Sequence, residues 1–444
     1  MKPPPYVFVF ICLCIACSIE PCSTQSVLMD THKINVLTDK VCLEEAYEMA
    51  SLQTKGISSN IIVEPVIDAA GDTLMYLVNY SEGWKILSAD KRTPAVIAQG
   101  ESGYISFSTE NCGLLSWLWI MAADMKHIIH CDDSNLNFTE DQIKSHRHQW
   151  VKEPMRFQGD SLPIIPFHEG EWELQSVWTS EVYYDEVNHM VDAHWDQTDP
   201  YNYYCPPKDY GDGNKPAGCA PVACGELLHF LCYHLNIPFE FEWNNLSGNI
   251  SEVDTMYHFL YCPTDKSPLL LRYLGDLLGA DYTDTGSGVT NSLTKVQQFY
   301  YDSLGINSTK QTYSINKVKQ NLLEGIPIMV SASSGPAASL NPDSPVGHSF
   351  IIDGYQRTLT MYQHYYTRLF GYPPILEEKI DTSYSSPHIS FIKMNWGWWT
   401  QWFVGTNDGW YALTGEWYVN IDNDPEPDRN YYGDIDILCD FYIP

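Results

Sequence analysis

Three short motifs, far apart in the sequence, most constrain what this chain can fold into. They are Gly218-Cys219-Ala220-Pro221, Gly347-His348-Ser349-Phe350 and Asn395-Trp396-Gly397-Trp398. A thiol that acts as a nucleophile needs a base within hydrogen-bond reach and a third group that orients the base. In chain order the motifs supply a cysteine, a histidine and an asparagine. A fold that brings them together has the side chains of a cysteine hydrolase.

Cys219 is predicted to lie at the start of a helix that runs from Pro221 to about Leu235. Leu227, Leu228 and Leu231 form its apolar stripe, and a proline is tolerated in the first turn of a helix. The helix dipole at this end would stabilise a thiolate and lower the pKa of Cys219. The alternative is that Cys219 is a small buried hydrophobic residue, as free cysteines usually are.

The other candidates have similar alternatives. His348 precedes a strand-like segment at 350–352 that would fix its ring, although most single histidines are structural or solvated. The Asn395 amide can accept from one imidazole nitrogen and so select the tautomer that takes the thiol proton. Trp396 can exclude water from that bond, or can simply belong to an aromatic core. Gln197 could donate to an oxyanion together with the Cys219 backbone N–H, although a glutamine in a loop is normally solvated.

A zinc site is a competing interpretation of the predicted helix. Five potential ligands occur within sixteen residues: Cys219, Cys224, His229, Cys232 and His234. However, Cys224 and Cys232 are eight residues apart, which separates them by roughly 12 Å along a helix. One zinc ion needs all its ligand atoms within about 2.0–2.3 Å. Core packing is therefore favoured, and we predict no metal and no organic cofactor.

Charge excludes some partners. The chain has 25 Lys+Arg and 56 Asp+Glu, a formal net charge of −31. Binding to nucleic acid needs a basic surface, and so does electrostatic binding to anionic lipid. We therefore expect no nucleic-acid partner, and contact with a membrane only through a covalent lipid.

The N-terminus predicts export. Lys2 is followed by an apolar run from Val7 to Ala16, which is too short to span a bilayer but typical of a signal peptide at residues 1–22. Ala16-Cys17 could be a lipoprotein cleavage site with a lipid on Cys17. The protein is expected to be secreted or to be a cell-surface lipoprotein.

Hydrophobic periodicity predicts an α+β chain with two regions, at 23–175 and 176–444. A Gly- and Pro-containing linker is predicted at 156–171. Helices are predicted at 112–130, 185–193, 221–235, 269–278, 296–303 and 315–323, and strands at 60–66, 73–78, 84–87, 326–331, 348–353, 390–395 and 409–413.

These motifs resemble the streptopain family of cysteine peptidases, which have the papain-like fold. The Gly-Cys pair opening a helix that ends in Tyr-His corresponds to Gly218-Cys219 through Tyr233-His234. The residues that carry the rest of the resemblance are Gln197 to Asn202, Trp243-Asn244-Asn245, Gly286-Ser287-Gly288, Gly347 to Gly354, Asn395 to Trp398 and Asp408 to Tyr411. The segment from Gly83 to Pro94 resembles the propeptide of the family.

The resemblance implies a papain-like catalytic domain at 176–444, preceded by an α+β inhibitory prodomain at 23–175. It implies an exported zymogen, inhibited by its own propeptide, that cleaves protein or peptide substrates. Cys219 would be the nucleophile, His348 the base and acid, and Asn395 the group that orients His348. Gln197 would serve the oxyanion and Trp396 would shield the site. The substrate cleft would be lined by Gly286, Ser287, Gly288 and Gly347.

The sequence also departs from the family. Cys224-Gly225-Glu226 is unusual, and Gly225 weakens a helix by about 1 kcal/mol relative to alanine. Trp399 replaces a glycine of the family and would crowd the cleft. A Tyr-rich insertion at 357–389 could overhang the active site. Two other functions stay open: a Cys-His amidase or transpeptidase acting on cell-wall peptides, and a non-catalytic binding protein of the same fold. The presence of Cys219, His348 and Asn395 together argues against the second.

Overall fold

The computed structural model describes ten stretches of the chain, all within one structural unit. They are 39–53, 60–107, 112–136, 138–150, 171–255, 265–333, 347–370, 375–397, 409–412 and 435–444. The predicted signal peptide, Cys17, Trp398, Trp399 and most of the predicted linker lie outside these residues. Within the described stretches, no helix is long and apolar enough to cross a membrane.

The elements come in two groups along the chain. The first group is α1 (Leu43–Gln53), β1 (Ile62–Ile67), β2 (Thr73–Tyr80), β3 (Gly83–Ser88), β4 (Val96–Gly100), α2 (Cys112–Ile128), the 3₁₀ turn η1 (Asp133–Asn135) and α3 (Glu140–Gln149). The second group is β5 (Glu173–Val187), α4 (Cys219–His234), β6 (Glu240–Trp243), β7 (Leu246–Asn249), η2 (Ile250–Glu252), α5 (Ser267–Leu278), β8 (Asp281–Tyr282), β9 (Ser287–Gly288), α6 (Ser292–Leu304), β10 (Asn307–Thr312), α7 (Ile315–Leu323), β11 (Ile328–Ser333), β12 (Gly347–Phe370), β13 (Ile375–Tyr384), β14 (His388–Asn395), β15 (Gly409–Ala412) and β16 (Ile435–Tyr442).

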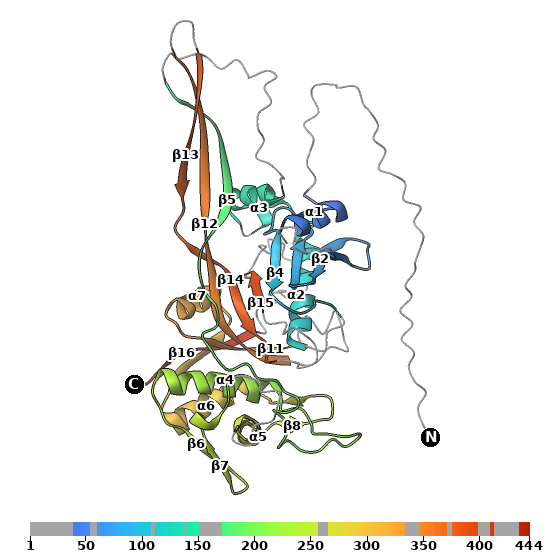
Figure 1. Cartoon of the computed structure of the whole chain (residues 1–444), viewed down its shortest axis with the longest axis vertical. Helices are drawn as coiled ribbons and strands as arrows, with labels where there is room; N and C mark the ends of the chain where they lie inside the picture. The colour runs from blue at the N-terminus through green and yellow to red at the C-terminus, as the bar shows by residue number, and fades with distance from the viewer. Residues whose placement is uncertain are drawn as a thin grey trace, which may run out of the picture. The chain divides into compact units, whose positions relative to one another are not determined.

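One antiparallel sheet joins the two groups (Figure 1). Its order is β1-β2-β3-β4-β15-β14-β12-β11-β16-β10, with β5 and β13 also paired to β12. The two groups meet where Gln99 and Ala98 of β4 pair with Trp410 and Tyr411 of β15. Glycine at position 409 allows this approach, because a Cβ there would lie 2.6 Å from the Gln99 carbonyl oxygen. The N-terminal strands are thus an extension of the sheet that carries His348 and Asn395.

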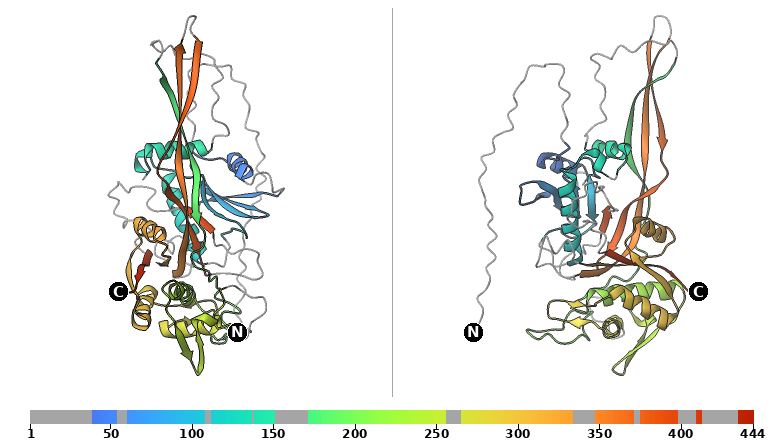
Figure 2. Two further views of the ribbon diagram at one scale, coloured as in Figure 1. Left: turned by 60° about the vertical axis from the view of Figure 1, so that its left-hand side comes forward. Right: turned by 180° about the vertical axis from the view of Figure 1, so that it is seen from behind.

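The two faces of this sheet are covered by different parts of the chain. One face, with Ile351 of β12, packs into a core formed by α4, α5 and α6, which we call the helical core. The other face, with Phe350 and Ile352, packs into a core that also contains residues of β2, β3, β4 and α2; we call it the shared core. Neighbouring residues of a strand point to opposite faces, which explains the division. In both views of Figure 2, as in Figure 1, the teal helix α2 lies above the yellow-green helix α4.

Beyond residue 358, β12 continues as the middle strand of a three-stranded arm made of residues 173–183, 359–370 and 375–384. None of these described residues belongs to a hydrophobic core. At about 3.3 Å per residue, position 359 lies roughly 35 Å along the strand from His348. Figure 1 shows the arm running away from α4. The described part of the insertion therefore does not overhang the site, contrary to the expectation.

Most predicted elements are confirmed. The α+β class holds, and the helices predicted at 112–130, 221–235, 269–278, 296–303 and 315–323 correspond to α2, α4, α5, α6 and α7. The helix predicted at 185–193 is wrong, because residues up to 187 belong to β5. This strand is rich in β-branched and aromatic residues, which favour strands. The predicted domain boundary after residue 175 falls inside β5, and the division into domains stays a prediction.

Candidate active site

Cys219 is the first residue of α4, as the motif predicts. Gly218 precedes it with a φ of 96°, in the left-handed region that favours glycine. A Cβ at Gly218 would also lie 2.8 Å from the Ser287 carbonyl oxygen. The loop at 286–288 and the start of α4 therefore approach each other closely, and the Ser287 hydroxyl donates to the Pro216 carbonyl at 2.6 Å. Of the residues predicted to line the cleft, Ser287 lies against Gly218 and Pro216, just before Cys219; the cleft lining by Gly286, Ser287, Gly288 and Gly347 stays a prediction.

His348 lies near the start of β12, which begins at Gly347, and its neighbour Ser349 donates its backbone N–H to the Cys219 sulfur at 3.4 Å. The His348 Nε2 lies 3.0 Å from the backbone carbonyl oxygen of Trp396. A carbonyl can only accept, so Nε2 carries the proton and Nδ1 is the basic nitrogen of the neutral ring. The backbone carbonyl of Trp396 thus selects the tautomer of His348, a role that was predicted for Asn395.

Burial favours the neutral form of both groups. Burial raises the pKa of the Cys219 thiol, and backbone N–H groups of Ser349, Ala220 and Cys219 itself act in the opposite direction. The thiol keeps part of its surface exposed, but the surrounding protein is dense enough for desolvation to dominate. Burial also lowers the pKa of His348 to about 4, and the Trp396 carbonyl opposes this. The N–H groups at the helix end therefore lower the pKa of Cys219, as predicted, but burial outweighs them and the net shift is upward, which corrects the predicted net lowering.

Asn395 ends β14 and is almost completely buried, with 1% of its surface exposed. Its Nδ2 donates to Glu226 at 3.1 Å and to the Ala193 carbonyl at 3.3 Å, while its Oδ1 accepts from Gly397 N–H at 3.0 Å. These partners fix the orientation of the amide, because Nδ2 faces two acceptors and Oδ1 faces a donor. None of the hydrogen bonds that the structure gives for Asn395 reaches His348, so its role as the orienting group stays a prediction.

Gln197 is buried, with 4% of its surface exposed. Its Nε2 has no hydrogen-bond partner among the described residues. Leaving a buried N–H unpaired costs about 1–3 kcal/mol. The Gln197 carbonyl accepts from Ala217 N–H at 2.7 Å, which places this loop beside the start of α4. The side chain of Asp196 holds the turn by accepting from the backbone N–H groups of Gln197 and Thr198, and burial raises its pKa to about 7. A buried, unpaired donor is what an oxyanion site requires.

Trp396 lies in the shared core with 1% of its surface exposed. Its ring is 4.5 Å from Phe350 and 6.1 Å from His348, measured between centroids. Its indole N–H donates to the Tyr411 hydroxyl at 3.0 Å. Tyr411 in turn contacts the rings of Trp84 and Trp117, both from the N-terminal part of the chain. An aromatic cluster therefore extends from the N-terminal part to the imidazole.

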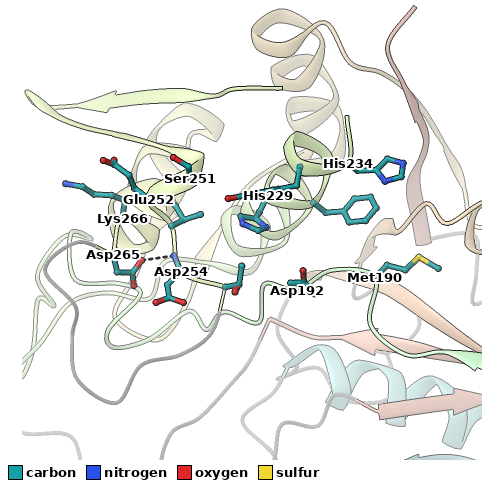
Figure 3. Close-up of a pocket in the computed structure, with 13 residues that line it drawn as sticks. Met190, Asp192, His229, His234, Ser251, Glu252, Asp254, Asp265 and Lys266 are labelled. Atoms are coloured by element: carbon teal, nitrogen blue, oxygen red, sulfur yellow. Dashed lines mark hydrogen bonds between the residues drawn. The ribbon is translucent and has the colours of Figure 1, made fainter. Parts of the chain in front are cut away.

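The potential zinc ligands of the predicted helix lie in different surroundings. Cys224 and Cys232 are buried in the helical core, whereas His229 and His234 line a cavity of about 1070 Å³. Figure 3 shows this cavity, with Asp192, Ser251 and Lys266 also on its wall. Among the described residues, no three His, Cys, Asp or Glu side chains could hold a metal ion together. Cys219 does not line this cavity.

Sequence reasoning missed three contributors to the site: the Ser349 N–H, the Trp396 carbonyl and the Glu226 carboxyl. Backbone groups carry no sequence signal. Glu226 did give one, because it is an acidic residue on the apolar side of a predicted buried helix. It is fully buried, and it contacts Trp195 and Asn395.

A thiol at the start of a helix, an imidazole with a fixed tautomer and a buried amide donor are the features of a cysteine-dependent hydrolase. Residues 195–411 match the model of the Peptidase C10 family, and this part of the chain belongs to that family, the streptopain family that the motifs resemble. The protein is therefore a cysteine-type peptidase. No curated protein matches the chain.

Two solved structures are similar to this chain, both with TM-scores below 0.5. A fragment of prointerpain A from Prevotella intermedia has a TM-score of 0.48 and 15% sequence identity, and the match covers 85% of this chain and 98% of that chain. The active wild-type interpain A cysteine protease of the same organism has a TM-score of 0.34 and 18% identity, with 58% of this chain and 95% of that chain covered.

Proposed function

We propose that the protein is an exported cysteine endopeptidase, made as an inactive precursor, that hydrolyses peptide bonds through Cys219, His348 and Asn395. The observation that carries the proposal is the hydrogen bond from Ser349 N–H to the Cys219 sulfur. It joins the start of α4 to the strand residue that follows His348. The nucleophile and its base are thus held by two elements that are packed against each other.

The proposed reaction begins when His348 Nδ1 takes the proton of the Cys219 thiol. The sulfur then attacks the carbonyl carbon of the scissile peptide bond, and its oxygen becomes an oxyanion. The Cys219 backbone N–H and Gln197 Nε2 donate to that oxyanion, and each such donor typically contributes about 3 kcal/mol. His348 returns the proton to the leaving amine. Water, deprotonated by His348, then hydrolyses the thioester and frees the cysteine.

The N-terminal part is proposed to be the inhibitory propeptide. Its strand β4 pairs with β15, and its Trp84 and Trp117 pack on Tyr411, which bonds to Trp396. Burial keeps the thiol and the imidazole neutral in this arrangement. A neutral thiol is a weak nucleophile, which fits a precursor. Export through a signal peptide at 1–22, with secretion or a lipid on Cys17, belongs to the same proposal and depends on the sequence alone.

The proposal is tested with Cys219→Ala in the full chain. Hydrolysis of casein should fall by at least about 1,000-fold, because the nucleophile of a covalent mechanism is lost. Cys224→Ala is the control, because this thiol is buried in the helical core and does not bond to His348 or Ser349. Measurable casein cleavage by Cys219→Ala at the native rate would exclude the mechanism. Failure of the native enzyme to cut casein, with activity on cell-wall peptides instead, would favour an amidase.

A further inference from the structure

Glu226 has an environment that helix packing alone does not explain. It lies seven residues after Cys219, two turns further along the same face of α4. The side chain is fully buried, with 0% of its surface exposed, among the apolar residues of the helical core. Burying a carboxyl group costs free energy unless good hydrogen bonds replace its contacts with water.

Both oxygens of Glu226 accept hydrogen bonds from segments that reach the active site. Oε1 accepts from the backbone N–H of Trp195 at 2.7 Å, and Oε2 accepts from Asn395 Nδ2 at 3.1 Å. Trp195 lies two residues before Gln197. Asn395 directly precedes the residue whose carbonyl bonds to His348 Nε2. One side chain therefore connects the nucleophile helix, the loop of the oxyanion donor and the turn that holds the base.

Gly225 gives an independent observation at the same place. A Cβ at position 225 would lie 2.7 Å from the Trp195 ring, 3.2 Å from Leu271 and 3.3 Å from Leu274. Glycine weakens a helix by about 1 kcal/mol relative to alanine. Here it lets the indole of Trp195 lie directly against α4, next to the carboxyl that bonds to its backbone. The Gly225-Glu226 pair thus fixes both the position and the orientation of the Trp195–Gln197 segment.

We propose that Glu226 is a positioning residue of the peptidase, which acts through Asn395 and the Trp195–Gln197 segment. By accepting from Asn395 Nδ2, Glu226 turns Oδ1 of that amide toward Gly397, whose backbone N–H it accepts. This fixes the turn whose Trp396 carbonyl holds His348. A glutamine could not replace it fully. A glutamine amide has one oxygen acceptor and one NH₂ donor. Either the Trp195 N–H or the Asn395 Nδ2 group would therefore face an N–H donor instead of an acceptor.

The inference depends on the proposed roles of Cys219, His348 and Asn395, and the test separates the two. The variants Glu226→Ala and Glu226→Gln are compared with Asn321→Ala, which removes another fully buried polar side chain, on α7. Each precursor is processed with a trace of native enzyme, and kcat and KM are measured on labelled casein. For Glu226→Ala we expect kcat to fall on the order of 100-fold with little change in KM, because small misplacements of reacting groups cost about that much.

Glu226→Gln has nearly the same shape, and its kcat should lie between those of the native enzyme and Glu226→Ala. Asn321→Ala should lower the unfolding midpoint but leave kcat unchanged at temperatures where it is folded. Introducing Glu226→Ala into Asn395→Ala should cost less than it costs alone, because the contribution that passes through the Asn395 contact is already lost.

An equal loss in both backgrounds would overturn the inference, and so would native kcat in Glu226→Ala. If the native processed enzyme itself does not cut casein, the proposed function fails instead.

Discussion

The two cores of this protein differ in which part of the chain builds them. The helical core is made by residues from 191 onward, all within the proposed catalytic region. The shared core takes about half of its buried residues from the N-terminal part, including Trp84, Trp117 and Leu118. The side chains of the site divide in the same way. Cys219 begins a helix of the helical core, whereas Trp396 and Phe350 lie in the shared core.

The difference suggests how the N-terminal part could control the site without covering it. Removing that part would leave the helical core, and with it the support of Cys219, intact. It would uncover Tyr411 and Trp396, whose backbone carbonyl holds His348. Under the proposed function, the nucleophile lies on the side of the sheet that loss of the N-terminal part would leave unchanged, and the base lies on the side that it would alter.

The largest expected effect comes from truncating one aromatic residue of the shared core. Trp84→Ala should lower the free energy of unfolding of the precursor by about 3–5 kcal/mol, because the buried indole leaves a cavity. Leu228→Ala in the helical core should cost about 2–5 kcal/mol in the precursor and in the processed enzyme alike. Urea unfolding of both forms measures this. A precursor with Trp84→Ala that unfolds like the native one would show that the two parts do not share a core.

The next effect concerns acid. The pKa of His348 is lowered by burial from its ordinary value of 6.5 to about 4, so between these values the unfolded chain binds a proton that the folded precursor does not. The free energy of unfolding is therefore unaffected by the protonation of His348 above pH 6.5. It decreases as the pH drops from 6.5 toward 4, by up to about 3 kcal/mol. Asp124 and Asp196, with pKa values raised to about 7 by burial, act in the opposite direction.

Because other groups also titrate in this range, the measured quantity is the difference in unfolding free energy between the native precursor and a His348 variant. Urea unfolding of the native precursor and of His348→Gln is compared from pH 4 to 8, which cancels the contributions of other groups. The native protein should lose stability relative to the variant below pH 6.5. If the shared core is what buries His348, the same difference should be smaller in the processed enzyme. A pH-independent difference in the precursor would mean that the ring is not kept neutral by burial.

The sequence predicted well what depends on local pattern. Residues 315–323 were predicted as a helix from their apolar spacing and form α7 with those bounds, and the strand predicted at 390–395 forms most of β14. The motifs also indicated which segments meet, since Cys219, His348 and the 395–397 turn are linked by hydrogen bonds through Ser349 and Trp396. These results follow from side-chain periodicity and from residue types that the chemistry requires.

Features that depend on distant pairing or on side-chain direction could not be predicted. The arm forms because 173–187 pairs with a strand about 180 residues later, and neither segment indicates its partner. The direction of the Asn395 amide depends on Glu226 and Ala193, which lie in two other segments. The raised pKa of Cys219 depends on how much protein surrounds the helix end, which the helix dipole alone does not determine.

A smaller effect tests the turn that lies between the two cores. Gly397 has a φ of 61°, and a Cβ there would lie 2.9 Å from Val222 of α4. Gly305 has a φ of 68° with nothing within 4 Å of such a Cβ, so it is a matched control. Either glycine-to-alanine change should cost about 1–2 kcal/mol for the left-handed backbone. Only Gly397→Ala should also lower kcat, since Val222 must shift. Equal kcat values for the two variants would show that the turn tolerates the displacement.

The smallest effect is expected at the base of the arm, next to residues that belong to neither core. Arg357 bonds through Nε to Asp185 Oδ1 at 2.6 Å and through a second nitrogen to Oδ2, and the guanidinium lies 5.2 Å from the Tyr184 ring. The Arg357 hydrogen bond lowers the pKa of Asp185, but Asp185 is 44% exposed, so solvent screens the pair.

Arg357→Ala should therefore cost at most about 1 kcal/mol, less in high salt, and should leave kcat unchanged. A double-mutant cycle with Asp185→Ala, followed by urea unfolding, measures the coupling. Helix α3 lies against part of β5, but the described residues of the arm belong to no hydrophobic core, so its strands depend largely on pairing and on such cross-strand contacts. A loss of several kcal/mol would contradict the contrast between two hydrophobic cores and an arm that belongs to neither of them.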